Sequence, residues 1–446
     1  MITELPSLGT YDYIIVGSGP AGISAALRLH ENLPDATIAI VESGVMEHND
    51  TIQELSSLTG SADLGAAHFA WHTRRILGGT SSIWGGWCAA LEERAFNAGE
   101  WPIEYSDIAP FYPAAAEIVN APELAHTNIQ TEIAETTDLI YKPFYLTRQL
   151  RIQDKYGSWL EENQKIEVII GQTCTKIEEV DGTVTGIVTK ESTGTAADEH
   201  TLKASHYIIA CGGVINARIL QLSGIIPNDS LGQNLMEHPH IYAATDIYLD
   251  VAKITPYMVE DVPVAHALQL SPALCEQEGL LSFSVEFRIN DTIEEKLLGR
   301  SRELTLCPVT IRSEMQPQQS NAITLSEQLD HLGQPRGHVN FQFNYNDLAN
   351  RSWEVFCSSL LASGLGRPGT LPPQLDLRGG GHYIRTTRMG SSPENSVVDA
   401  NCKVHGIDNL FIAGSSIFPA SGAANPTFSI VAFALRLSDH LSNLAA

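Results

Sequence analysis

The sequence predicts an α/β protein in which a dinucleotide-binding Rossmann domain is interleaved with an α+β substrate-binding domain built on a sheet. Three observations lead to this prediction. A strand, a glycine-rich turn, a helix and a second strand follow one another within residues 11–41. Two further strand-like runs, at 207–210 and 410–413, also lead into glycine. The nucleotide-binding half is therefore expected to be interrupted and resumed.

The first element is a β-α-β unit. Residues 11–16 form a short apolar, β-branched run, 23–30 repeat apolar residues with helical spacing, and 37–41 form a second strand-like run. Together with the glycines between them, these runs have the order and spacing of a dinucleotide-binding fingerprint.

The glycines of this unit have separate expected roles. Gly17 makes the tight turn, Gly19 lets the backbone approach a pyrophosphate, and Gly22 lets helix and strand pack closely. Pro20 and Ala21 lie between them, at the start of a helix whose N-terminus would hold the phosphates.

Glu42 ends the second strand, 20 residues after Gly22. A carboxylate at this point accepts hydrogen bonds from adenosine ribose hydroxyls and disfavours a ribose 2′-phosphate. Ser43 follows it and belongs to the same predicted site. The motif alone leaves two dinucleotides open, FAD and NAD(H).

The next element is the loop 76–87, in which four glycines and three hydroxyl residues lie among apolar residues. Such a loop brings backbone against a flat, polar ligand. From this segment we predict cofactor contacts by Arg75, Gly78, Gly79, Thr80, Ser82, Trp84, Gly85 and Gly86.

Residues 166–210 are rich in β-branched residues and are broken by an Asp-Gly turn, which predicts a β-meander. The meander leads into a second glycine turn and a helical pattern at 214–224. Cys174, Ala210 and Gly212 are predicted cofactor contacts on this stretch.

From 241 to 373 the glycine turns become rare, and strand-like alternation appears in HALQL, LSFSVEF, NAITLS and HVNFQFNY. These four runs predict one sheet on the substrate side. We assign 1–100, 160–240 and 375–446 to the dinucleotide domain, and 101–159 and 241–374 to the substrate domain.

The last element follows the third glycine turn, where Gly414 and Ser415 are predicted cofactor contacts. Asn425 suits the N-cap of the final helix, and Pro426 suits its first position. Thr427 completes the predicted cofactor set.

Composition excludes some partners. A formal charge of −25 repels phosphate backbones, so nucleic acid is not expected. The apolar runs are shorter than the roughly 18 residues that cross a bilayer, so no transmembrane segment is expected. The start, Met1 to Pro6, lacks the basic and apolar regions of a secretory signal, which predicts a cytoplasmic protein.

Four blocks of sequence together resemble the glucose-methanol-choline (GMC) family of FAD-dependent oxidoreductases. They are YDYIIVGSGPAG with IVESG; RILGGTSSIWGGW; YIIACGGVINARIL with LGQNLMEHPH; and the stretch from GHYIRTTRMG to NPTFSIVAFALR. The resemblance implies FAD and a glutathione-reductase-like Rossmann domain beside a sheet-based substrate domain. The last block is nearest the branch of pyranose oxidases and bacterial sugar and sugar-acid dehydrogenases.

On that match, His382 is the catalytic histidine and Asn425 its partner. The resemblance implies oxidation of an alcohol group of a sugar or sugar-like polyol, with hydride passing to flavin N5. Imidazole suits removal of the hydroxyl proton because its pKa lies near working pH. Alternatives are oxidation of a cationic aminosugar or other small natural-product alcohol, and a non-redox lyase that keeps FAD. The electron acceptor is open among oxygen, a quinone and a protein.

Three departures from the family pattern have consequences. Ile83 stands where flavin-tethering relatives have a histidine, so the FAD is expected to be non-covalent. Gly85 stands where those enzymes place a threonine near flavin N5. Arg385 replaces a small residue, and we expect it either to reach the substrate or to contact the surface or a flavin phosphate.

His238 and His240 are spaced to point the same way from a strand, which suggests a metal site. We expect no metal because the sequence shows no third ligand with suitable spacing. Trp71, Trp84 and Trp101 are expected to pack in the core or cofactor cavity, and Trp87 to form part of the pocket wall.

Overall fold

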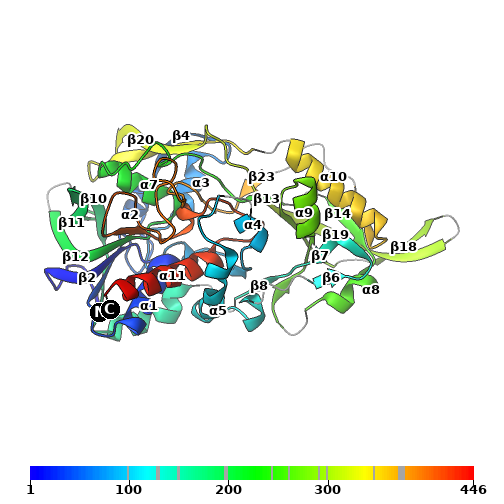
Figure 1. Ribbon diagram of the computed structural model, residues 1–446, viewed down its shortest axis with the longest axis horizontal. Helices are drawn as coiled ribbons and strands as arrows, with labels where there is room; N and C mark the ends of the chain where they lie inside the picture. Colours follow the sequence, from blue (N-terminus) through cyan, green and yellow to red (C-terminus); the bar gives the residue numbers. More distant parts are fainter. Residues whose placement is uncertain are drawn as a thin grey trace.

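Two large sheets occupy opposite ends of an elongated molecule, with helix α11 (Thr427–Ala445) lying between them in Figure 1. The structure is a computed structural model. It describes residues 1–97, 100–126, 131–147, 151–194, 199–242, 245–259, 262–289, 292–297, 300–344, 347–369 and 377–445. The domain boundary predicted between residues 374 and 375 lies outside these ranges, and the domain assignment stays a prediction.

The first sheet is the predicted dinucleotide-binding sheet. Its described strands follow the order β1-β9-β3-β2-β12-β11-β10, with β24 beside β12. Strand β2 is parallel to both β3 and β12, and β12 is parallel to β24, so segments from both ends of the chain meet here. The strands are β1 (Ile2–Thr3), β2 (Thr10–Val16), β3 (Ile38–Val41), β9 (Ile166–Ile169), β10 (Gln172–Val180), β11 (Thr183–Glu191), β12 (Glu199–Ile209) and β24 (Leu410–Ile412).

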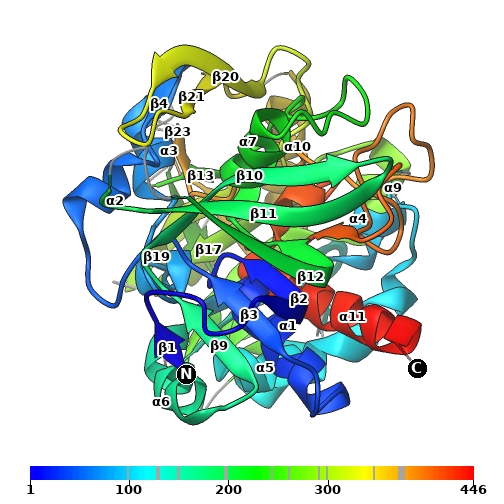
Figure 2. The same cartoon turned by 90° about the vertical axis from the view of Figure 1, so that its left-hand side faces the viewer.

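The meander predicted for 166–210 is present as antiparallel β10, β11 and β12, which cross the face shown in Figure 2. The turn between β10 and β11 is Asp181-Gly182, and both residues have positive φ, 51° and 82°. Two consecutive positive φ values are what a two-residue hairpin turn requires, and Asp-Gly supplies them at low cost.

Helix α1 (Pro20–Asn32) begins at a proline, as predicted, and packs against α11. Small residues permit this contact, because the Ser438 hydroxyl donates to the carbonyl of Ala25 at 3.2 Å. Arg28 and Asp439 form an ion pair across the same helices. Helix α7 (Gly212–Leu222) follows the second glycine turn.

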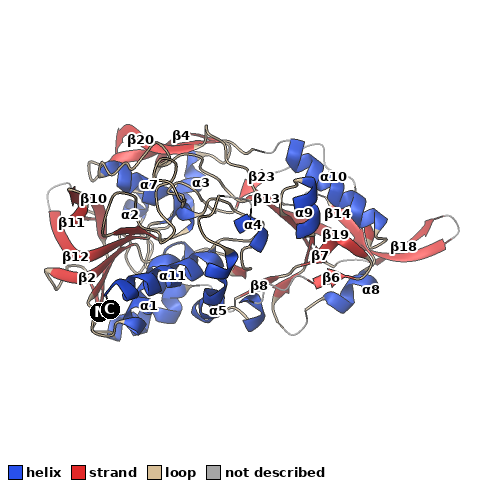
Figure 3. Cartoon of the chain, in the orientation of Figure 1, coloured by secondary structure: helices blue, strands red, loops and turns tan. Residues whose placement is uncertain are grey.

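The second large sheet is the predicted substrate-side sheet. Its described strands follow the order β22-β14-β19-β17-β16-β7-β6, while β13 and β18 pair with β19 and β23 pairs with β13. Figure 3 shows α9 (Pro272–Glu278) and α10 (Asp347–Ala362) along one side of this sheet. The strands are β6 (Thr131–Ile133), β7 (Thr136–Tyr141), β13 (Pro239–Ile241), β14 (Asp246–Leu249), β16 (Ala267–Leu270), β17 (Phe283–Phe287), β18 (Thr292–Leu297), β19 (Arg300–Ser313), β22 (Gly366–Pro368) and β23 (Leu377–Gly379).

The interpretation of four runs as one sheet is wrong. HALQL and LSFSVEF contribute β16 and β17, but NAITLS and HVNFQFNY contribute β20 (Ala322–Leu329) and β21 (Pro335–Phe341) of a separate sheet. There β21 lies parallel to β4 (Leu58–Ala62), and both β20 and β21 contact α7. Alternation predicts a half-buried strand but does not say which neighbour the strand pairs with.

Another small sheet joins the two ends of the molecule, with strands β5 (Trp87–Cys88), β8 (Phe144–Leu146) and β15 (Val264–Ala265). The remaining helices are α2 (Asp50–Glu54), α3 (Ala66–Trp71), α4 (Glu93–Asn97), α5 (Tyr112–Val119), α6 (Ile152–Glu162) and α8 (Val251–Ile254). Among the described residues, none of the helices has the length and apolar character needed to cross a membrane.

Candidate active site

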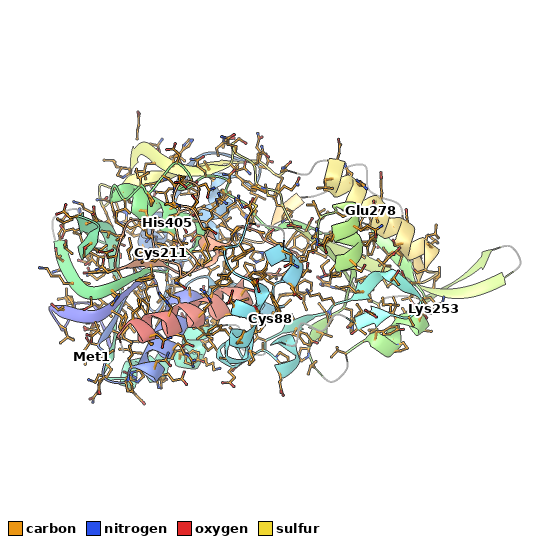
Figure 4. The ribbon with its side chains drawn as sticks, in the orientation of Figure 1. Met1, Cys88, Cys211, Lys253, Glu278 and His405 are labelled. Carbon is orange, nitrogen blue, oxygen red and sulfur yellow. The ribbon has the colours of Figure 1, made fainter. Side chains whose placement is uncertain are left out.

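A cavity of about 400 Å³ lies where the N-termini of α1 and α11 and the loop 75–87 meet strands β13 and β19. Cys211, labelled in Figure 4, is one of its lining residues on the dinucleotide-binding side. The predicted residues that line it are Gly17, Gly19, Pro20, Ala21, Glu42, Ser43, Arg75, Gly79, Thr80, Trp84, Gly85, Cys174, Ala210, Gly212, His382, Gly414, Ser415, Asn425, Pro426 and Thr427.

Four predicted cofactor residues, Gly22, Gly78, Ser82 and Gly86, are not among those that line the cavity. Gly22 packs the helix onto the turn instead, since a Cβ there would stand 1.9 Å from the carbonyl oxygen of Gly17. This is the close helix–strand approach that the sequence predicts for it.

The glycine turn leaves room for a dinucleotide. Gly17 has φ of 104°, and a Cβ on it would meet the carbonyl oxygen of Ala210 at 2.6 Å. A Cβ on Gly19 would meet nothing within 4 Å, and Gly19 lines the cavity as the N-cap of α1 with no capping side chain. Backbone amides at such a helix start suit a pyrophosphate, so the residues fit the predicted cofactor.

Glu42 is buried, and its carboxylate accepts hydrogen bonds from protein groups. Oε2 accepts from the amide and hydroxyl of Ser18 at 2.9 and 2.6 Å, and Oε1 accepts from the amide of Gly44 at 2.7 Å. The carboxylate therefore orders the loops around the turn. Its predicted bond to ribose hydroxyls stays a prediction.

Arg75 brings a buried positive charge to the same end of the cavity. Its guanidinium donates to the hydroxyls of Ser43 and Ser56, each at 2.9 Å. Burial and the neighbouring Arg218 lower the pKa of Arg75 to about 10. A guanidinium in this position suits an anionic or polar part of a nucleotide.

His382 and Asn425 lie in the wall of this one cavity, as the sequence predicts. His382 Nδ1 and Asn425 Oδ1 are both buried and have no hydrogen-bond partner within the protein. Buried polar atoms without a partner are a costly arrangement, and both of these belong to residues that line the cavity.

Buried Glu237 fixes the backbone that carries His382. Its Oε1 accepts from the amide of His382 at 2.7 Å, and Oε2 accepts from the amides of His238 and Gly380 at 2.6 and 3.3 Å. Burial raises the pKa of Glu237 to about 7. The segment before β13 and the segment carrying His382 are therefore tied together by one carboxyl group.

His382 is one of three clustered histidines. Its ring centroid lies 5.4 Å from those of His238 and His240. Burial, His238 and Arg312 lower the pKa of His382 well below its ordinary value. Since the pKa lies below neutrality, the imidazole is uncharged at pH 7. The same shift makes it a weaker base than the ordinary imidazole that the sequence argument assumed.

The reason given above for excluding a metal is wrong, because the fold supplies the third ligand that sequence spacing could not reveal. One ring nitrogen from each of His238, His240 and His382 lies within 4.8 Å of the others. Against a cation, Arg312 faces all three rings and lowers their pKa values. The expectation of no metal stays a prediction.

Arg312 forms the substrate-side wall with Trp87. Its guanidinium stacks 4.3 Å from the Trp87 ring, pairs with buried Glu286, and leaves Nε without a hydrogen-bond partner. A Cβ on Gly85 would stand 2.6 Å from the Trp87 ring, so any residue other than glycine would force the ring to move. Trp87 thus lies in the pocket wall, as predicted.

A family model described as pyridine nucleotide-disulphide oxidoreductase matches residues 11–247, which is more than half of the chain. A model described as GMC oxidoreductase matches residues 317–434, the segment that includes His382 and Asn425. The chain belongs to the GMC oxidoreductase family.

Curated relatives of this GMC oxidoreductase are similar over part of their length. The 6′′′-hydroxyparomomycin C oxidase of Streptomyces lividus is 36% identical over 132 residues, 29% of this chain and 24% of the relative. The C-glycoside 3-oxidase of Arthrobacter globiformis is 24% identical over 304 residues, 63% of this chain and 54% of the relative. The chain thus spans about a quarter to a half of these relatives.

The fold is also that of solved GMC-type structures. The pyridoxine 4-oxidase from Mesorbium loti superimposes with a TM-score of 0.63 at 16% identity, covering 96% of this chain and 99% of that one. FAD is the cofactor of this GMC oxidoreductase. The glycine turn at Gly17 and Gly19 and the starts of α1 and α11 are where the chain has room for it.

Of the alternatives expected for Arg385 in the GMC oxidoreductase, the two that place it in the cavity are wrong, because Arg385 does not line the cavity. Its guanidinium pairs with Glu100, a carboxylate that is 40% exposed at the surface, and donates to the carbonyl of Pro419. The packing expected for Trp71 is also wrong. Trp71 is 56% exposed rather than packed. Trp101 is buried against Phe418 and Phe433, and so belongs to the core as expected.

Sequence reasoning missed Arg312 and Tyr242, which also line the cavity of this GMC oxidoreductase. A signal for each was present. Arg312 ends the strand-like run VTIR, and a charged residue in a buried strand is rare unless it has an ionic or hydrogen-bonding partner. Tyr242 follows His238 and His240 at a spacing of two, which places all three on one face of an extended chain.

Proposed function

We propose that this GMC oxidoreductase oxidises an alcohol group of a sugar or sugar-like polyol to a carbonyl, with His382 as base and Asn425 as hydroxyl partner. One observation carries the proposal. His382 Nδ1 and Asn425 Oδ1 are unpaired, buried, and belong to residues in the wall of the cavity that begins at the dinucleotide turn.

The chemistry suits these side chains. Bound FAD supplies a hydride acceptor. An alcohol that gives up hydride must also lose its hydroxyl proton, and uncharged His382 has a ring nitrogen free to take it. The Asn425 amide can hold the same hydroxyl in position. The start of α11 beside Asn425 adds the positive end of a helix dipole, which stabilises negative charge developing there.

The substrate class follows from the relatives, among which are a C-glycoside 3-oxidase, a fructose dehydrogenase and a pyranose 2-oxidase. A second candidate, a cationic aminosugar, draws support from the relative named 6′′′-hydroxyparomomycin C oxidase. Arg312 in the cavity wall gives this candidate no support, because its positive charge already pairs with buried Glu286. A non-redox lyase on this fold is the remaining alternative.

An anaerobic stopped-flow screen tests the proposal. Sugars, sugar acids, aminosugars and simple alcohols are mixed with the FAD-loaded protein while the flavin absorbance is followed. A sugar or polyol should bleach the flavin. No bleaching by any of these compounds, together with turnover of a substrate at constant flavin absorbance, would contradict alcohol oxidation and favour a lyase.

His382→Ala should slow flavin bleaching about 10²–10⁴-fold, because a positioned base contributes that much. FAD should remain bound, since the dinucleotide turn is untouched. The matched control is His405→Ala, because His405 binds Ser396 and is not a lining residue of the cavity. A His382→Ala protein that bleaches at the wild-type rate would return His382 to a structural role.

We also propose that the FAD is held without a covalent bond. Ile83, which lines the cavity at the position aligned with the tethering histidine of relatives, has no nucleophilic atom. Acid precipitation should leave the yellow colour in the supernatant. A flavin attached to a peptide, detected by mass spectrometry of a digest, would contradict this. The electron acceptor stays open among oxygen, a quinone and a protein. The cytoplasmic location stays a prediction.

A further inference from the structure

Three side chains at one edge of the cavity form a hydrogen-bonded row that runs from the interior to the surface. His238 Nδ1 lies 3.3 Å from His240 Nε2, and His240 Nδ1 lies 3.0 Å from the hydroxyl of Tyr242. The exposed fraction rises along the row from 1% and 5% to 47%. Tyr242 also borders a second cavity, of about 420 Å³.

The buried end of the row lies beside the proposed base. Ring nitrogens of His382, His238 and His240 lie within 4.8 Å of one another. Gly380 keeps the rings close, since a Cβ there would stand 2.6 Å from the His382 ring and 2.8 Å from the His240 ring. A ring rotation or one bridging water therefore spans the gap.

We propose that His238, His240 and Tyr242 form a proton relay that carries the substrate's hydroxyl proton from His382 to the solvent. The inference rests on the proposed function, because it needs His382 to receive that proton. Its physical basis is that each member of the row can give one proton and take one, which lysine and arginine side chains in their charged forms cannot do.

The steps balance. The alcohol O–H bond breaks and an N–H bond forms on His382 while hydride leaves the carbon. His382 then gives a proton to Nε2 of His238, His238 Nδ1–H gives one to Nε2 of His240, His240 Nδ1–H gives one to the Tyr242 oxygen, and the Tyr242 hydroxyl gives one to water. The reverse passage restores the starting tautomers when an acceptor such as oxygen or a quinone takes up protons.

A relay fits the charges of the site better than a metal ion does. Arg312 is paired across the sheet with His240, as the register of β13 and β19 shows, and faces all three histidines. A divalent cation among them would lie beside this guanidinium. Two buried carboxyl groups lie near the cluster, and both have partners: Glu237 accepts from backbone amides, and Glu286 pairs with Arg312. Imidazoles are neutral at rest and carry a single positive charge only while a proton passes, so they meet less of this repulsion than a permanently bound divalent cation would.

The decisive experiment follows proton release and flavin bleaching together. FAD-loaded protein and an alcohol found by the screen are mixed anaerobically in weak buffer with a pH-indicator dye. In wild type, proton release should keep pace with bleaching. In Tyr242→Phe and His240→Gln, proton release should lag behind the flavin bleaching of the same variant by about tenfold or more, whatever the rate of bleaching itself.

Tyr141→Phe is the matched control. Tyr141 also binds a histidine, His266, through its hydroxyl at 2.7 Å, but neither residue lines the cavity. It should show no lag. Added imidazole, a small proton carrier, should remove the lag in Tyr242→Phe, which a purely structural defect would not allow. Proton release that keeps pace with bleaching in both relay variants would overturn the relay.

A second measurement does not depend on a substrate. Nitrogen NMR of selectively ¹⁵N-labelled histidines, assigned with single variants, should find His238 and His240 uncharged with the proton on Nδ1. Charged rings, a proton on Nε2 of either residue, or signals that change on treatment with a chelator would overturn the relay, the last in favour of a metal site. If no alcohol bleaches the flavin, the proposed function fails and the relay fails with it. If an alcohol bleaches the flavin but the histidine tautomers differ from those expected, the relay alone fails.

Discussion

Gly380 shows how a missing side chain sets the chemistry of its neighbours. The rings of His382 and His240 both pack against its Cα, and Glu237 accepts its backbone amide. The histidine nitrogens are therefore positioned from the backbone outward, by a carboxyl group that holds the chain and a glycine that leaves the rings their space. Residues that do not react themselves, Glu237 and Gly380, therefore set the positions of the reacting histidine.

Gly380→Ala should slow flavin bleaching about 10²-fold, because displacement of a reacting group by about 1 Å has an effect of that order. Flavin content of the purified protein should match wild type, since the dinucleotide turn is distant in sequence. Gly157→Ala, in α6, is the control: a Cβ there meets nothing within 4 Å, and bleaching should be unchanged. Equal rates for both variants would show that the ring positions do not depend on Gly380.

At the scale of the element, α11 begins differently from the sequence prediction. The amide of Ile430 donates to the carbonyl of Pro426 at 2.8 Å, which makes Pro426 the residue before the first helical turn. Asn425 Oδ1 has no hydrogen-bond partner, so the N-cap assigned to Asn425 is wrong. The preference of asparagine for caps is an average over many helices, and here the side chain lies in the cavity wall instead.

Because Asn425 does not cap α11, Asn425→Ala should affect the reaction rate and not the stability. Flavin bleaching should slow about tenfold through loss of one hydrogen bond to the alcohol, while the melting temperature should stay within about 2 °C of wild type. Asn49→Ala is the comparison variant in which a true cap is removed. The Asn49 side chain caps α2 by accepting a hydrogen bond from the amide of Ile52. This variant should lose about 1 kcal/mol of stability and keep its bleaching rate. A large fall in the melting temperature of Asn425→Ala would restore the capping role.

At the scale of the whole molecule, buried histidines set the response to acid. Burial lowers the pKa of His68 to about 4 and of His238 to about 3, and lowers those of His240 and His382 well below 6.5. The unfolded chain takes up protons on these rings below pH 6.5 while the folded protein does not. Glu237, with its pKa raised to about 7, and Glu314, whose pKa burial also raises, act in the opposite sense but are fewer than these rings.

The free energy of unfolding should therefore be highest above pH 6.5 and fall as the pH drops toward 4.5, by about 1.4 kcal/mol per pH unit for each net proton taken up on unfolding. Urea titrations at pH 7.5, 6.5, 5.5 and 4.5 measure this. His238→Gln, which carries one such ring fewer, should lose stability less steeply. A flat profile between pH 6.5 and 4.5 in the wild type would show that the rings are protonated in the folded state.

Local signals in the sequence were enough for the N-terminal β-α-β unit, the Asp181-Gly182 hairpin and the set of cavity-lining glycines. Each depends on neighbours within a few residues. The third histidine beside His238 and His240, and the pairing of β21 with β4, come from segments more than 100 residues apart. Periodicity carries no information about such pairings, which arise only when sheets and helices pack.

Strand β24 and helix α11 lie late in the sequence but pack against early segments, which delays completion of the dinucleotide-binding domain during synthesis. Strand β24 pairs with β12, and α11 packs against α1, so α1 lacks its main helical partner until residues 427–445 have been synthesised. The β10–β11 hairpin can close as soon as it leaves the ribosome, because its strands are adjacent in sequence. The surface of α1 that packs against α11 therefore stays uncovered while the residues between the two helices are made, and exposed apolar surface of this kind favours aggregation.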